Sequence, residues 1–132
     1  MRHSSGFSLI ELTIVVGLVA IISMVAAGYF GDSATRANRT DARAGMTAVA
    51  GSLEKCRSLY GSYNSASCNV AFPVATDNNY YAITAALTAT TFALTATPVA
   101  GGPQAADADC TTLTLTNTGI QGATGADTSR CW

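Results

Sequence analysis

An apolar stretch near the N-terminus constrains this chain more than any other feature. Residues 7–30 read FSLIELTIVVGLVAIISMVAAGYF and contain one charged residue, Glu11. As a helix this stretch would be about 36 Å long at ~1.5 Å per residue, which exceeds the ~30 Å hydrocarbon core of a bilayer. We therefore expect residues 7–30 to form a single membrane-spanning helix with some tilt.

Two residues at the start of the stretch do not suit a simple anchor. Glu11 puts a carboxylate in the apolar run, at a cost of roughly 2.5–3.5 kcal/mol at the bilayer centre and less near the end of the helix. Gly6 directly precedes the run, where a small residue suits a peptidase that cuts ahead of the hydrophobic segment. A conventional signal peptide cut after residues 25–27 and a plain signal anchor are the alternatives, and both fit an interrupted run of this length poorly.

The run Gly6-Phe7-Ser8-Leu9-Ile10-Glu11, with the apolar residues that follow it, resembles the class III leader and first helix of type IV pilins. The short leader and the phenylalanine resemble the type IVa branch of that family. The resemblance implies that residues 1–6 are a leader that a prepilin peptidase removes by cutting between Gly6 and Phe7. It also implies N-methylation of the new terminal residue, Phe7, and assembly with other pilin subunits by an inner-membrane machinery. Glu11 lies one helical turn from Phe7, on the same face. We expect its carboxylate to neutralise the Phe7 amine of a neighbouring subunit and so to set the axial register of packing.

The cysteines indicate an exported domain. All four, Cys56, Cys68, Cys110 and Cys131, follow the apolar stretch. An even number in a small exported domain favours two disulfides, for which three pairings are possible. We favour bonds between neighbours in sequence, Cys56–Cys68 and Cys110–Cys131. No CxxC motif occurs and the only histidine, His3, lies in the leader, so we expect no metal site.

The remainder predicts an α+β fold. No proline precedes Pro73, so one helix can run from Phe7 to about Tyr60. An apolar stripe follows its second half at alternating steps of four and three: Ala42, Met46, Val49, Leu53, Cys56 and Tyr60. Charged residues fall largely off that stripe: Arg39, Asp41, Arg43, Glu54 and Arg57.

Strands are predicted at residues 80–86, 91–97 and 111–116. The expected fold is a long N-terminal helix, half transmembrane and half amphipathic, packed on a three- to four-stranded antiparallel sheet. The layout resembles the pilin fold, in particular PilE-like small pilins. Residues 31–132 would form the globular domain, in which a Cys110–Cys131 bond pins an otherwise floppy tail, residues 119–132. We expect Trp132 to plug the sheet.

The composition argues against several functions. Charged residues make up 11% of the chain, the formal net charge is −1, and no run of like charges occurs, so DNA binding is possible but not signalled. Once the leader is removed no histidine remains, and the only close pair of carboxylates, Asp107 and Asp109, suits a solvated acidic loop, with calcium binding as the minor alternative. We expect no catalytic residue and no cofactor, and hence no enzyme.

The expected function is that of a structural subunit of a bacterial type IV pilus. The subunit would be stored among the lipids of the inner membrane with its C-terminal domain in the periplasm. It would then join a surface filament used for adhesion, twitching motility or DNA uptake. A competence minor pilin, a type II secretion pseudopilin and a non-assembling, membrane-tethered binding domain are the alternatives. Basic residues in the tail would favour the competence pilin, and Arg130 is the one found there.

Overall fold

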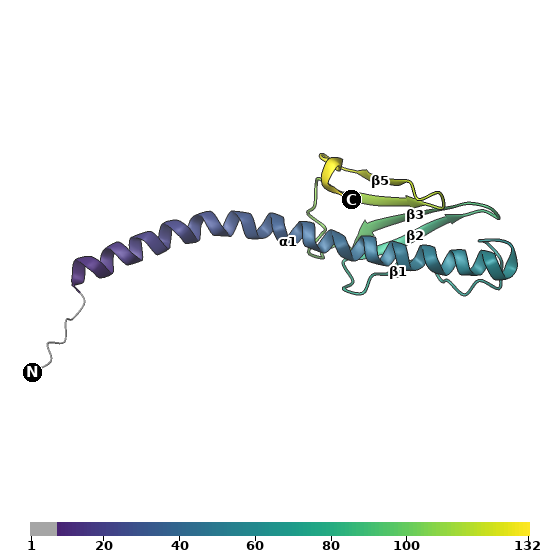
Figure 1. Ribbon diagram of the computed structural model, residues 1–132, viewed down its shortest axis with the longest axis horizontal. Helices are drawn as coiled ribbons and strands as arrows, with labels where there is room; N and C mark the ends of the chain where they lie inside the picture. The colour runs from purple at the N-terminus through teal and green to yellow at the C-terminus, as the bar shows by residue number, and fades with distance from the viewer. Residues whose placement is uncertain (1–7) are drawn as a thin grey trace, which may run out of the picture. The chain divides into compact units, whose positions relative to one another are not determined.

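The computed structural model describes residues 8–132, except for the side chains of residues 27–29 (Figure 1). The elements in chain order are α1 (Leu9–Tyr60), β1 (Val74–Ala75), β2 (Tyr81–Leu87), β3 (Phe92–Pro98), β4 (Thr112–Thr116), β5 (Gln121–Thr124) and the short 3₁₀ helix η1 (Thr128–Arg130). The chain divides into two compact units, residues 1–34 and residues 35–132. Peptidase cleavage after Gly6 and methylation of Phe7 lie outside the described residues.

The first unit carries the apolar part of α1. Its most apolar window has a mean hydropathy of 2.6 and none of that window is buried, so by length and composition the helix could cross a membrane. Hydroxyl groups in this part bond to the helix itself. Thr13 Oγ1 donates to the Ile10 carbonyl at 2.8 Å, and Ser23 Oγ donates to the Val19 carbonyl at 2.8 Å. These bonds satisfy both hydroxyls without a partner helix.

In the second unit an antiparallel sheet packs against the C-terminal half of α1, as the sequence predicted (Figure 1). The strand order is β1-β2-β3-β4-β5. One inward row of the sheet joins Ile83 to Ala96 and Ala96 to Leu113. Packing α1 over this row buries a single apolar core between one helix and one face of the sheet.

The sheet has five strands instead of the three or four expected. β1 was missed because it has only two residues, and β5 because its sequence, QGAT, does not alternate. Tertiary contacts order β5. The Thr111 N–H donates to the Thr124 carbonyl at 2.7 Å, and Trp132 Nε1 donates to the Gly122 carbonyl at 2.7 Å. Trp132 also packs against the core, as predicted.

The predicted apolar stripe is buried along most of its length. Ala42, Met46 and Leu53 are fully buried, and Val49 and Cys56 are nearly so. Tyr60 was placed on the same stripe wrongly, because its side chain is 51% exposed. The helix ends at Tyr60, one turn beyond the sheet-covered positions, so periodicity no longer enforces burial there.

Gly45 lies where α1 comes closest to the sheet. A methyl group on Gly45 would lie 2.8 Å from Thr76 Cγ2 and 3.0 Å from Ile83 Cδ1. Gly51, on the exposed side of α1, has no atom within 4 Å of the corresponding position. Gly45 therefore lowers helix propensity but permits close packing, whereas Gly51 only lowers propensity.

These two glycines should respond oppositely to the same substitution. We expect Gly51→Ala to stabilise the second unit by up to about 1 kcal/mol through helix propensity. Gly45→Ala should destabilise it, because overpacking costs roughly 1–3 kcal/mol and exceeds the propensity gain. Urea unfolding of the full chain would measure both. If Gly45→Ala stabilises the unit as much as Gly51→Ala does, the contact with Thr76 does not exclude a methyl group at position 45.

Candidate functional site

The first candidate site is the start of α1. Glu11 lies in the first turn of the helix and its side chain is exposed. Among residues 8–132, no cation pairs with Glu11 within 4 Å. The exposed carboxylate of Glu11 is therefore available to a charge on another molecule.

A buried ion pair holds the loop between β3 and β4 to α1. Arg39 Nε and Nη2 donate to the two carboxylate oxygens of Asp107, each at 2.7 Å, and both side chains are 2% exposed. Both predictions for these residues were wrong: Arg39 was expected off the buried stripe and Asp107 in a solvated loop, and both are buried. Arg39 is three residues before Ala42 and so continues the stripe. A bidentate pair offsets much of the cost of burying each charge.

Electrostatics favour the ionised pair. Burial alone raises the pKa of Asp107, but hydrogen bonds from Arg39 and from the Cys110 N–H, with the charge of Arg39, lower the pKa below its ordinary value. The hydrogen bond to Asp107 raises the pKa of Arg39. Both groups therefore stay charged at neutral pH.

Further contacts fasten the chain end. Arg39 Nη1 donates to the Arg130 carbonyl at 3.1 Å, and Arg43 Nε donates to the Cys131 carbonyl at 3.2 Å. A disulfide joins Cys110 to Cys131, which is one of the two favoured pairings. Two arginines of α1 are thus used to hold backbone carbonyls of the tail.

A second group of residues lies where α1 ends. We call Lys55, Arg57 and Tyr60 the helix-end cluster. Arg57 Nη1 donates to Tyr63 Oη at 3.1 Å and to the Thr90 carbonyl at 3.4 Å, and its guanidinium carbon is 5.0 Å from the centre of the Tyr63 ring. These contacts fix Arg57 at the surface. Lys55 and Tyr60, which precede and follow Arg57 on the last turns of α1, are also exposed.

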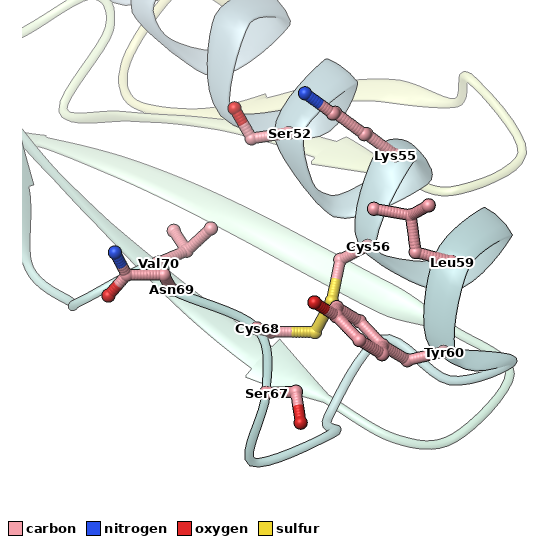
Figure 2. Close-up of a pocket in the computed structure, with 9 residues that line it drawn as sticks. All are labelled: Ser52, Lys55, Cys56, Leu59, Tyr60, Ser67, Cys68, Asn69 and Val70. Carbon is pink, nitrogen blue, oxygen red and sulfur yellow. A yellow bond between two sulfur atoms is a disulfide. The ribbon is translucent and has the colours of Figure 1, made fainter.

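An open pocket of about 290 Å³ adjoins this cluster. Figure 2 shows its walls, α1 on one side and the following loop on the other, with the Cys56–Cys68 disulfide between them. This disulfide is the other favoured pairing. The pocket is lined by Ser52, Lys55, Cys56, Leu59, Tyr60, Ser67, Cys68, Asn69 and Val70. Lys55 is the one charged residue among these nine.

Positive charge in the second unit is confined to α1 and the chain end. The cations are Arg36, Arg39, Arg43, Lys55, Arg57 and Arg130, and residues 58–129 contain no lysine or arginine. The sheet face turned away from α1 is instead built from threonine and alanine, with Thr84, Thr95 and Thr114 in one row. Basic residues were expected in the tail, and those at the end of the helix were not predicted as a site. The gap in lysine and arginine from residue 58 to residue 129 was the available signal.

In the described part of the chain, no group of three or more histidine, cysteine, aspartate or glutamate side chains lies close enough to hold a metal ion. Asp107, one of the two carboxylates considered for calcium, is occupied by Arg39.

Comparison with known protein families gives two matches. Residues 1–27 match the model of the prokaryotic N-terminal methylation motif. Residues 29–114 match the model described as "Type IV minor pilin ComP, DNA uptake sequence receptor". No curated protein sequence matches the chain.

The second match covers about two thirds of the chain, from within α1 to Thr114 in β4. It includes the helix-end cluster and the loop with Cys68, and it stops before β5 and the tail. Together with the helix-on-sheet fold and the methylation motif, it confirms the resemblance to type IV pilins. The chain therefore belongs to the family of the type IV minor pilin ComP, DNA uptake sequence receptor, and is a structural pilus subunit and not an enzyme.

Proposed function

We propose that this chain is a minor subunit of a type IV pilus that binds DNA at the surface of competent bacteria. The family match over residues 29–114 carries the proposal, because the name of that family describes a DNA uptake sequence receptor. It favours the competence alternative over the general adhesion or motility subunit that the sequence first suggested. It gives no support to a type II secretion pseudopilin.

The route to the pilus follows from the N-terminus. The prepilin is held in the inner membrane by α1, with residues 35–132 in the periplasm. Prepilin peptidase cuts between Gly6 and Phe7 and methylates Phe7, and the assembly machinery then packs the subunit among other pilins. The methylation-motif match over residues 1–27 and the exposed apolar part of α1 support this route.

DNA contact requires cations that are free to meet phosphates. Arg39 is buried against Asp107, and Arg43 donates to the Cys131 carbonyl. Arg130 interacts electrostatically with Asp127: hydrogen bonds from Ser129 lower the pKa of Asp127, and the positive charge of Arg130 lowers it further. Each of these three arginines therefore already interacts with another group of the protein.

The helix-end cluster is better suited to phosphate. Of its two cations, Arg57 interacts with one carboxylate, Glu54, which already accepts a hydrogen bond from Tyr63 Oη at 2.6 Å. Arg57 uses only Nη1 in its contacts with described residues, so Nε and Nη2 remain available as donors. We therefore propose that the two cations of the helix-end cluster, Lys55 and Arg57, contact the phosphates of the DNA.

A binding experiment tests the proposal. The full chain, purified in detergent, is mixed with sheared genomic duplex of its own host, and retained fragments are sequenced. We expect DNA to be retained and one short sequence to be enriched among the fragments. If no DNA is retained at low salt, the chain is not a DNA receptor.

Charge removal then tests the surface. Lys55→Gln combined with Arg57→Gln should reduce the slope of log affinity against log salt by about 2, because each lost phosphate contact reduces it by ~1. Arg130→Gln, which removes one cation at the chain end, is the control and should leave the slope unchanged. If Arg130→Gln reduces the slope and the double variant does not, the DNA-binding surface lies at the chain end instead.

A further inference from the structure

We infer that the pocket beside the helix-end cluster receives an unpaired nucleotide of the bound DNA, with Tyr60 stacking on the base and Lys55 meeting its phosphate. The inference rests on the proposed DNA-binding function and specifies which part of the DNA the pocket takes.

Tyr60 is the first reason. It ends a stripe whose other members are buried in the core, yet its side chain is 51% exposed and it lines the pocket. The adjacent Leu59 is 64% exposed and lines the same pocket. Core packing therefore does not account for the aromatic ring. An exposed tyrosine that lines the same pocket as a cation, Lys55, offers the two groups with which proteins hold unpaired nucleotides, a ring for the base and a charge for the phosphate.

The charge of the pocket is the second reason. Its nine lining residues include one cation, Lys55, and no carboxylate. Such a pocket suits an aromatic group joined to an anion, which is the chemistry of a nucleotide. Ser52, Ser67 and Asn69 add hydroxyl and amide groups that can bond to the edge of a base.

The form of the DNA follows from access to the base. In a perfect duplex each base is stacked on both faces, so a tyrosine ring in a pocket cannot reach it unless the base leaves the stack. Phosphates stay accessible in duplex and unpaired DNA alike. Lys55 can therefore contact phosphates in both forms, whereas Tyr60 can stack only on an unpaired base at a bulge, a gap or a frayed end.

The Cys56–Cys68 disulfide makes the pocket ready to bind. It joins the helical wall to the loop wall, and Ser67 and Asn69 flank Cys68 directly (Figure 2). The Cys68 N–H also donates to the Ser65 carbonyl at 2.9 Å, which forms a turn within the loop. A wall ordered before binding avoids the entropy cost of ordering it on the ligand.

The test compares two labelled probes by fluorescence anisotropy with the full chain in detergent. One is a short duplex enriched by the chain itself, and the other is the same duplex with a bulge of unpaired thymines. We expect the wild-type chain to bind the bulged duplex roughly tenfold more tightly, as one stacked base allows. Tyr60→Ala should remove this preference and leave affinity for the perfect duplex unchanged, and Tyr60→Phe should keep the preference.

The other outcomes separate the two proposals. If the wild-type chain binds both probes equally, or if Tyr60→Ala keeps the preference, the nucleotide pocket is wrong and the DNA-binding function stands. If the chain binds neither probe, the DNA-binding function itself is wrong. If Tyr60→Ala weakens both probes to the same extent, Tyr60 contacts duplex DNA and the pocket does not select unpaired bases.

Discussion

Glu11→Ala should leave the chain in the membrane and reduce its amount in filaments at least tenfold. Glu11 is an exposed carboxylate in the first turn of an apolar helix, and no described cation neutralises it. In the proposed assembly, the N-terminal amine of Phe7, one turn away in sequence, is the charge that a neighbouring subunit would offer. Loss of the carboxylate leaves that amine unpaired in an apolar filament core, where a lone charge is costly.

Membrane storage should not suffer, because the substitution removes a charge whose insertion costs up to roughly 2.5–3.5 kcal/mol. Immunoblots of membranes and of sheared filaments would report the two pools separately. Thr13→Ala is a matched control in the same part of α1, since the Thr13 hydroxyl is already bonded to the Ile10 carbonyl. Filaments that contain the normal amount of the Glu11→Ala chain would disprove the assembly role.

The parts of the structure governed by local patterns could be predicted from the sequence. Hydropathy alone identified the apolar part of α1. The spacing of apolar residues three and four positions apart identified the buried stripe from Ala42 to Cys56. Three strands were placed to within one residue at each end, because each alternates or is rich in residues that favour strands, such as tyrosine, isoleucine and threonine.

Features that depend on distant contacts could not be predicted. Arg39 and Asp107 are 68 residues apart, and each is expected at the surface when considered alone. β5 forms because β4 and Trp132 offer partners to a stretch with little strand propensity. The pocket beside Tyr60 needs the loop with Cys68 to lie against the end of α1, which periodicity in the helix cannot indicate.

The largest loss of stability is expected from Asp107→Ala, at about 3–5 kcal/mol. The substitution leaves the Arg39 guanidinium buried without a counter-charge, and it removes the acceptor of the Cys110 N–H. Trp132 is the only tryptophan of the chain and packs on the same unit, so its fluorescence follows urea unfolding directly. Asp109→Ala, an exposed carboxylate two residues away, is the matched control and should change stability by less than about 0.5 kcal/mol.

Acid should have the same effect as the mutation. The pKa of Asp107 is below its ordinary value of 3.8, so the carboxylate contributes stability at any pH above that value and loses the contribution as the pH falls through its folded pKa. We expect the stability difference between the wild-type chain and Asp107→Asn to be constant from pH 7 to about pH 5. It should then shrink as the pH falls below 3.8 and the wild-type carboxylate takes up a proton.

A double variant distinguishes the contribution of the ion pair from the cost of leaving either charge buried without its partner. Replacing both members by apolar residues, Arg39→Met with Asp107→Leu, removes the buried charge that each single variant strands, so much of the lost stability should return. If the double variant is as unstable as the sum of the single variants, Arg39 and Asp107 contribute independently. Recovery would show that the contribution of the ion pair to the free energy of unfolding is smaller than the single variants suggest.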